Sequence, residues 1–248
     1  MKNEDKIDFI TSWIRDYVHN MPNPAKSLVV GVSGGIDSAL TSTLSSMTGL
    51  KTVAISMPIN TSSGTHDLGQ VHGKWLKGNY NNTTFITIDL TAIYEQFNSV
   101  MINSNQKSDL GFANSKSRLR MITLYQVAAA QNGIVVGTGN KVEDFGVGFY
   151  TKYGDGGVDI SPIADLMKSE VKSLASTLKI DKRIIDAPPT DGLWDDGRTD
   201  EKQLGLSYDQ LEDAMQDEYS SNRAKYHDIR KYNLHKMEPI PVCKIPKS

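Results

Sequence analysis

Cysteine is almost absent from this 248-residue chain, which has a single one, Cys243, near its end. One cysteine cannot form a disulfide within the chain, nor can it build a CxxC redox site or a cysteine-rich zinc site. A lone free thiol is typical of a reducing compartment, so we expect a cytoplasmic protein. The length corresponds to one large α/β domain, which we place over residues 1–248.

Long hydrophobic runs and an excess of one charge are also missing. No stretch approaches the ~18 consecutive apolar residues of a membrane helix, and the N-terminus lacks the apolar segment of a secretory signal. Lysine and arginine together number 27, and aspartate and glutamate 29, which gives a net charge of −2. This balance argues against a nucleic-acid or membrane partner, because no field of the whole molecule would attract one.

Short apolar runs alternate with helical patterns along the chain. The runs predict strands at residues 28–32, 52–57, 85–88 and 134–138. Apolar residues at helical spacing predict helices at residues 5–20, 36–47, 90–102, 115–131, 165–178, 208–219 and 222–232. Strands that alternate with helices, and that are apolar on both faces, indicate an open, mostly parallel α/β sheet with helices on both faces.

The glycine-rich segment Gly31-Val32-Ser33-Gly34-Gly35-Ile36-Asp37-Ser38 lies between the first predicted strand and a helix. Glycines in such a turn let backbone N–H groups approach an anion, and the positive end of the following helix faces the same point. Asp37 would repel a bare phosphate, so a carboxylate there fits an anion site only together with a cation such as Mg²⁺. The alternative is an ordinary strand-to-helix turn in which Asp37 stabilises the helix N-terminus.

This segment resembles the SGGxDS loop of the N-type ATP pyrophosphatases, enzymes that split ATP between its α and β phosphates. Later segments narrow the resemblance, namely residues 137–143 (GTGNKVE), 148–159 (GFYTKYGDGGVD), 162–168 (PIADLMK), 188–193 (PPTDGL) and 199–208. In this order they are similar to ammonia-dependent NAD synthetases over about residues 5–241. The resemblance implies a Rossmann-like fold of the adenine nucleotide alpha hydrolase type, and a homodimer with deamido-NAD near the subunit interface.

The resemblance also implies a role for each matching residue. Asp37 and Glu143 would bind Mg²⁺, and Asp37 and Lys168 would act in catalysis. The ATP-binding residues would be Gly31, Val32, Ser33, Gly34, Gly35, Ile36, Asp37, Ser38, Thr138, Lys168 and Thr190. The deamido-NAD-binding residues would be Arg120, Lys152, Asp159, His235 and Lys236.

Two of these roles have alternatives in the sequence. After Glu143 the chain is one residue longer than the commoner pattern, which leaves Glu143 or Asp144 as the second metal ligand. We favour Glu143, because it keeps its spacing from Thr138. Lys168 lies among acidic neighbours on the predicted helix 165–178, where an isolated lysine is typical of a solvated helix face.

Two polar segments, residues 58–69 and 191–205, are predicted lids that would exclude water from a reactive intermediate. Trp194 lies in the second segment, where it would either cover a bound ring or anchor the loop to the body. Asp155 is our candidate for the general base that takes a proton from ammonium.

The resemblance to ammonia-dependent NAD synthetases implies ATP- and Mg²⁺-dependent amidation of deamido-NAD to NAD, the last step of NAD biosynthesis. A carboxylate does not react with ammonia until AMP is transferred to it, and ammonia then displaces AMP from the mixed anhydride. Use of glutamine would need a glutaminase domain with a cysteine nucleophile, and Cys243 in a proline-rich tail does not fit one, so free ammonia is the expected donor. The alternatives are another adenylating amidotransferase or a tRNA-modifying relative, and a non-catalytic nucleotide sensor.

Overall fold

Four strands form one parallel sheet in the computed structural model, which describes residues 1–60, 65–194 and 196–246. The sheet order is β3-β2-β1-β4 within those described residues. The strands are β1 (Ser27–Gly31), β2 (Thr52–Ser56), β3 (Thr83–Thr87) and β4 (Gly133–Val135). Leu28 of β1 lies in register with Thr52 on one side and Ile134 on the other. The predicted open parallel sheet is therefore confirmed.

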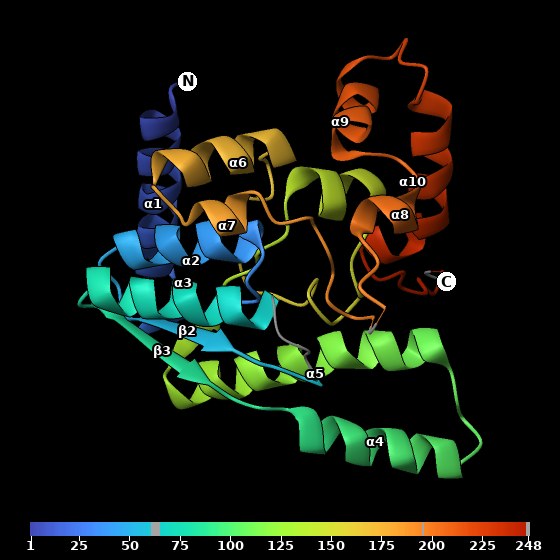
Figure 1. The fold of residues 1–248 in the computed structure, drawn as a ribbon, viewed down its shortest axis with the longest axis horizontal. Helices are drawn as coiled ribbons and strands as arrows, with labels where there is room; N and C mark the ends of the chain where they lie inside the picture. The colour runs from blue at the N-terminus through green and yellow to red at the C-terminus, as the bar shows by residue number, and fades with distance from the viewer. Residues whose placement is uncertain (61–64, 195, 247–248) are drawn as a thin grey trace.

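Helices cover both faces of this sheet (Figure 1). Successive side chains of a strand point to opposite faces. Leu28 and Val30 accordingly belong to one buried cluster, together with α1, α2 and α6, whereas Val29 belongs to a second cluster with α4 and α5. The bounds of these helices are α1 (Asn3–Asn20), α2 (Ile36–Met47), α4 (Thr91–Asn103), α5 (Asp109–Ala130) and α6 (Lys168–Thr177).

Two segments differ from the sequence-based expectation. Helix α3 (Thr65–Asn79) follows β2, where we expected a polar lid over residues 58–69; residues 61–64 of that lid lie outside the described part of the chain. A π-helix, η1 (Lys141–Val147), begins shortly after β4, over residues for which the sequence predicted no helix. The remaining helices are α7 (Lys182–Ile185), α8 (Asp200–Leu204), α9 (Tyr208–Gln216) and α10 (Arg223–Met237).

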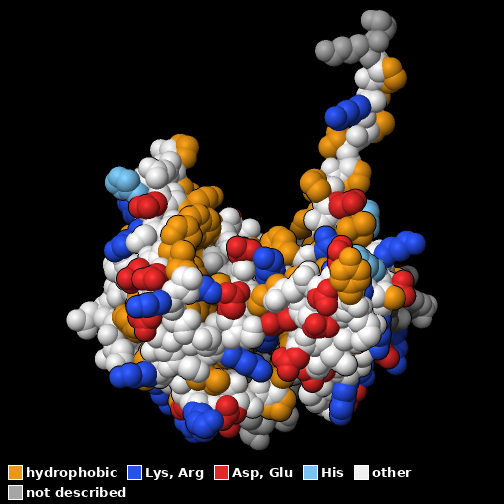
Figure 2. All heavy atoms as spheres, turned by 90° about the horizontal axis from the view of Figure 1, so that it is seen from above, with side chains coloured by type: hydrophobic (Ala, Val, Ile, Leu, Met, Phe, Trp, Pro, Cys, Tyr) orange, Lys and Arg blue, Asp and Glu red, His pale blue; other side chains and the backbone are white. Residues whose placement is uncertain are grey.

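A third buried cluster joins η1 to the C-terminal helices. It includes Val147 of η1, Leu204 of α8, Leu211 of α9 and Tyr226 of α10. These elements lie to one side of the sheet in Figure 1, and Figure 2 shows a hollow between two raised parts of the molecule, with the segment after α10 extending away from them. Because η1 follows β4, this cluster lies beyond the carboxyl ends of the strands, where open α/β sheets bind their ligands. The assignment of residues 1–248 to one domain stays a prediction.

No helix among the described residues has both the length and the apolar character that crossing a membrane requires. The cytoplasmic location that we expect from the single cysteine stays a prediction.

Candidate functional site

The glycine-rich loop joins β1 to α2 and is closed by its own serines. The Ser33 backbone N–H donates to Ser38 Oγ at 3.1 Å, and the two hydroxyl oxygens lie 3.0 Å apart. Gly34 has φ 93°, a conformation that L side chains rarely adopt. Gly35 then caps α2, so the first N–H groups of a twelve-residue helix face the loop. A phosphate group can bind at such a turn.

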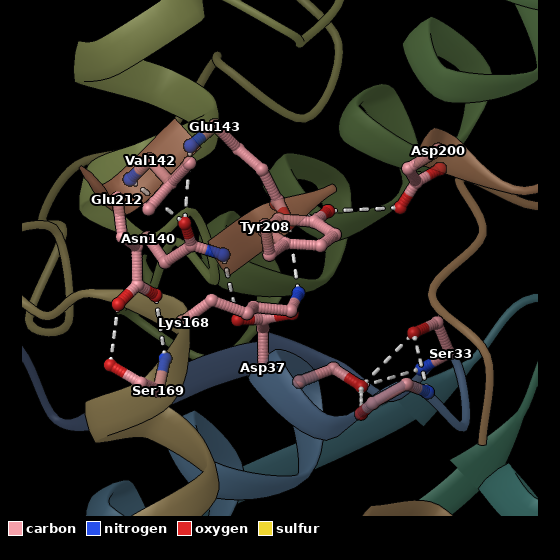
Figure 3. A network of polar contacts seen from close by, with 12 residues as sticks. Ser33, Asp37, Asn140, Val142, Glu143, Lys168, Ser169, Asp200, Tyr208 and Glu212 are labelled. Atoms are coloured by element: carbon pink, nitrogen blue, oxygen red, sulfur yellow. Dashed lines mark hydrogen bonds and ion pairs between the residues drawn. The ribbon is translucent and has the colours of Figure 1, made fainter. Parts of the chain in front are cut away.

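Lys168 lies beside this loop and connects two acids that are distant in sequence (Figure 3). Its Nζ is 2.5 Å from Asp37 Oδ2 and 2.8 Å from Glu143 Oε1. The residue is only 3% exposed. Burial opposes the charge of Lys168, but the carboxylates of Asp37 and Glu143 outweigh it and raise the lysine pKa. The alternative that Lys168 lies on a solvated helix face is therefore wrong, because the side chain is buried in an ion pair.

The π-helix η1 determines which of two neighbouring acids faces Lys168. Asn140 caps it: its side-chain oxygen accepts from the backbone N–H groups of Val142 and Glu143, and its Nδ2 donates to Asp37 Oδ1 at 2.9 Å. A π-helix takes up more residues per turn than an α-helix and is common at functional sites. The extra residue in this part of the sequence coincides with that turn.

Glu143 and Asp144 consequently have different surroundings. Glu143 contacts Lys168, whereas the Asp144 carboxyl packs directly against Gly139, where a Cβ would lie 1.8 Å from Asp144 Oδ2. Burial and the neighbouring Glu143 and Asp155 carboxylates raise the pKa of Asp144 well above its usual value. This geometry supports Glu143 as the second metal ligand, and the assignment stays a prediction.

Three polar residues of the site were not assigned from the sequence: Asn140, Tyr208 and Asp200. Tyr208 Oη lies 2.5 Å from Glu143 Oε1 and 3.2 Å from Asp200 Oδ2 (Figure 3). Burial is the main cause that raises the pKa of Asp200 to about 7, and the charge of Glu143 adds to it. Their only signal in the sequence was membership of the segments 137–143 and 199–208, because nothing local places them beside Asp37.

The donor set at this point fits a magnesium ion that is shared with phosphates. No group of three or more His, Cys, Asp or Glu side chains among the described residues could hold a metal ion alone. Asp37 and Glu143 supply two carboxylates that meet at one cation, Lys168. Mg²⁺ is usually bound through one or two carboxylates together with substrate phosphates and water. The pair therefore suits Mg²⁺ that enters with a nucleotide.

The other two predicted ATP residues do not contact this cluster through any bond that the structure gives. Thr138 is half-buried between β4 and η1. Thr190 is exposed, and its hydroxyl is used inside its own loop: it donates to the Arg198 carbonyl at 3.2 Å and accepts from the Gly192 N–H. The roles of Thr138 and Thr190 stay predictions.

Several hydrogen bonds connect the second predicted lid to the body, among them those from Lys225 Nζ to the Gly205 carbonyl and from the Tyr208 N–H to the Glu201 carboxylate. The Lys116 ammonium of α5 donates to the Leu193 carbonyl at 3.1 Å. The indole ring of Trp194 stacks under the Arg198 guanidinium at 4.2 Å from the ring centre, which packs it within the loop itself. Asp200 then connects the end of the loop to Tyr208.

Asp155 and the predicted acceptor-binding residues come from α5, the 148–159 segment and α10. Asp155 is exposed, and its Oδ1 accepts from Ser117 Oγ at 2.7 Å and from the Thr151 N–H at 2.9 Å. Arg120 Nε donates to the Met57 carbonyl at 3.2 Å, and burial lowers its pKa. Lys152 Nζ lies 5.6 Å from the centre of the adjacent Tyr153 ring.

The remaining three predicted acceptor-binding residues differ in how many of their polar atoms already bond within the protein. Asp159 accepts from the Val135 N–H at 2.7 Å and from the Tyr125 hydroxyl at 3.0 Å, so both of its carboxylate oxygens already take part in the fold. Lys236 Nζ donates to the Tyr150 carbonyl at 2.6 Å, and His235 beside it is exposed. Their assignment to deamido-NAD stays a prediction.

Comparisons with known proteins identify the family to which the chain belongs. The family model described as NAD synthase matches residues 6–246. The NH(3)-dependent NAD(+) synthetase of Mycoplasmopsis pulmonis is 38% identical over 212 residues, which are 84% of this chain and 77% of that protein. The structure of NMN synthetase from Francisella tularensis matches with a TM-score of 0.88 at 30% identity, over 99% of this chain and 100% of that one.

A further solved structure shows the same fold at lower identity. The NH3-dependent NAD synthetase from Campylobacter jejuni matches with a TM-score of 0.78 at 24% identity, over 98% of this chain and 100% of that one. The match of the family model over nearly the whole chain confirms the resemblance that the sequence motifs indicate. The chain therefore belongs to the NAD synthase family.

Proposed function

We propose that this protein converts deamido-NAD to NAD, using ATP, Mg²⁺ and ammonia and releasing AMP and pyrophosphate. The observation that carries the proposal is the position of Lys168, which holds Asp37 and Glu143 together beside an anion-binding turn. A lysine, two carboxylates and free helix N–H groups at one point are what the transfer of a nucleotidyl group requires.

In the first step, a carboxylate oxygen of the nicotinate ring attacks the α phosphorus of ATP. The bond from that phosphorus to the bridging oxygen breaks, and pyrophosphate leaves with the electron pair. The loop at residues 31–38 would hold the phosphates through its N–H groups, and Lys168 would neutralise the departing pyrophosphate. Mg²⁺, held by Asp37 and Glu143, supplies charge neutralisation at the phosphates when it is bound.

In the second step, ammonia attacks the carbonyl carbon of the mixed anhydride. The carbon–oxygen bond to AMP breaks, and AMP leaves with the electron pair as the amide forms. Asp155 would take the proton that the nitrogen loses, since its Oδ1 is fixed by Ser117 and the Thr151 N–H while the side chain stays exposed. The 191–205 lid would exclude water, which otherwise hydrolyses the anhydride.

Pyrophosphate release from ATP tests the proposal directly. We expect release only when deamido-NAD is present, and NAD formation only when ammonium is added as well. Release that ignores deamido-NAD but responds to another carboxylate acceptor would favour a different adenylating amidotransferase. Nucleotide binding without any release would favour a sensor.

A second acceptor, nicotinate mononucleotide, is supported by one comparison. The structure of an NMN synthetase matches 99% of this chain with a TM-score of 0.88 at 30% identity. Nicotinate mononucleotide carries the same carboxylate and would give NMN by the same two steps. We would measure kcat/KM for both acceptors at saturating ATP and ammonium, and a ratio of about tenfold or more, equal to about 1.4 kcal/mol, assigns the physiological acceptor.

A homodimer is supported by an exposed apolar stripe. Ile93, Phe97 and Val100 lie at helical spacing on α4, and Leu110 and Ile122 of α5 are also exposed. Exposed apolar side chains that gather on one face of a protein are typical of a protein–protein interface. We expect Phe97→Glu to shift the molecular mass from dimer to monomer in light scattering, whereas Tyr219→Glu, at an exposed aromatic residue between α9 and α10, leaves the dimer intact. A Phe97→Glu variant that stays dimeric would rule out this face.

A further inference from the structure

Tyr208 lies at the centre of the site, although its only signal in the sequence was its membership of the segment 199–208. It is the first residue of α9 and is 4% exposed. Its hydroxyl reaches Glu143, and the centre of its ring lies 4.8 Å from Lys168 Nζ (Figure 3). The side chain therefore touches both partners of the ion pair that the proposed function requires.

The phenol proton is donated to Glu143. A phenol has one proton, and two acids are within reach: Glu143 Oε1 at 2.5 Å and Asp200 Oδ2 at 3.2 Å. The shorter contact is that of a hydroxyl donating to a carboxylate. A tyrosine hydroxyl carries its proton at neutral pH, so it acts as the donor in this contact.

The bond from Tyr208 and the bond from Lys168 end on the same oxygen of Glu143. Lys168 Nζ donates to Oε1 at 2.8 Å, and Tyr208 donates to the same atom, so neither of them occupies Oε2. Two donors that converge on one carboxylate oxygen hold the plane of the carboxylate in place. Partners that orient a metal-binding carboxylate in this way typically change metal affinity when they are removed.

We propose that Tyr208 is a positioning residue, which holds the Glu143 carboxylate in the orientation that binds the divalent cation. The inference rests on the proposed function, because it assumes that Glu143 binds the metal. The first residue of α9 would then have a role in the site in addition to its packing in the buried cluster. It also ties the end of the 191–205 lid to the metal site, since Asp200 and Tyr208 are hydrogen-bonded to each other.

Mn²⁺ binding to Tyr208→Phe tests the proposal without catalysis. We expect about tenfold weaker Mn²⁺ binding in calorimetry, in the presence of a non-hydrolysable ATP analogue. The thermal midpoint should stay close to that of the wild type, because the ring and its packing are kept. In kinetics, the Mg²⁺ concentration for half-maximal rate should rise, while kcat at saturating Mg²⁺ is largely recovered.

Tyr226→Phe is the matched control. Tyr226 is a buried tyrosine of the same cluster, 7% exposed, whose hydroxyl makes only a 3.4 Å contact with the Gly146 carbonyl. Its loss should leave Mn²⁺ affinity unchanged. A folded Tyr208→Phe variant that binds Mn²⁺ as tightly as Tyr226→Phe overturns the proposal. If Tyr208→Phe does not fold, Tyr208→Gln and Tyr208→Leu are compared, and equal affinities for these two overturn it.

Glu143→Gln separates failure of this inference from failure of the proposed function. If Glu143→Gln binds Mn²⁺ like the wild type, the metal site itself is wrong. If Glu143→Gln loses affinity and Tyr208→Phe does not, only the role of Tyr208 is wrong. Tyr208→Phe should have no further effect in the Glu143→Gln background, because the hydroxyl acts through that carboxylate.

Discussion

Lys168 Nζ and Asp37 Oδ2 lie 2.5 Å apart, although the two residues are separated by 131 positions in the sequence. Asp37 comes from the first turn of α2 and Lys168 from the first residue of α6, so the packing of these two helices creates the contact. Glu143 adds a second carboxylate at the same Nζ. One buried cation therefore balances two acids, and each member of the group depends on the others.

Removal of Lys168 should destabilise the protein as well as inactivate it. Lys168→Met leaves the Asp37 and Glu143 carboxylates, each with a side chain 17% exposed, without their cation. Loss of one partner from a buried ion pair costs about 3–5 kcal/mol. We would measure the free energy of unfolding in urea. Lys141→Met is the control, since its pair with the exposed Asp165 should contribute less than about 1 kcal/mol. Equal stability of the two variants would contradict the role of Lys168.

Asp37→Asn should abolish turnover and keep the fold. The change preserves the shape of the side chain but removes the negative charge that faces Lys168 and the proposed Mg²⁺. We expect a fall in kcat of about 100-fold or more, with a circular dichroism spectrum like that of the wild type. Asp165→Asn, at an exposed position, is the control and should retain full activity. If Asp37→Asn unfolds instead, Asp37 is structural.

The strands and most helices could be predicted because their signals are local. β1 and β2 are runs of mostly buried residues, and each predicted end lies within one residue of the observed one. Helix α3 was missed because three glycines, Gly69, Gly73 and Gly78, weaken its helical pattern. Two of them have close neighbours: a Cβ at Gly73 would lie 2.2 Å from the Phe85 ring, and one at Gly69 would lie 3.3 Å from the Gly34 backbone nitrogen. Such contacts come from tertiary structure, which a local pattern does not contain.

Only those residues of the site that belong to a recognisable sequence motif could be predicted. The glycines of the turn at residues 31–38 indicate an anion site from the sequence alone, and Asp37 at the same turn then indicates a cation. The burial of Lys168 could not be seen, because its acidic partners lie 131 and 25 positions away. Asn140 and Tyr208 were missed for the same reason: their partners come from other elements, and neither residue type is distinctive alone.

Lys152→Ala should affect the acceptor rather than ATP. Lys152 is half-buried, and its Nζ is close only to the ring of Tyr153 in the contacts that the described residues show. Its loss should therefore leave stability unchanged within about 0.5 kcal/mol. We expect KM for deamido-NAD to rise by about tenfold or more, as for the loss of a charged hydrogen bond of about 1.5–3 kcal/mol, while KM for ATP stays constant. Lys172→Ala, at an exposed position of α6, is the control. Equal increases for both substrates would contradict the assignment.

His72 should make the protein sensitive to mild acid. It is 1% exposed within α3, bonds Ser42 Oγ at 3.1 Å and stacks on Trp75, and burial lowers its pKa to about 4. The unfolded chain has the ordinary pKa of 6.5. Between these two values the unfolded state binds a proton that the native state does not, so stability is full above about pH 6.5 and falls as the pH drops toward about 4.

The expected loss for His72 is about 2 kcal/mol between about pH 7 and about pH 5. His72→Gln keeps a polar partner for Ser42 but has no proton to gain. Its unfolding free energy should therefore fall by about 2 kcal/mol less than that of the wild type over the same interval. Other titrating groups cancel when the two proteins are compared. His19→Gln, at an exposed position of α1, is the control and should follow the wild type. Urea unfolding at both pH values measures the difference. Parallel curves for the wild type and His72→Gln would show that native His72 takes up its proton over this pH interval just as the unfolded chain does.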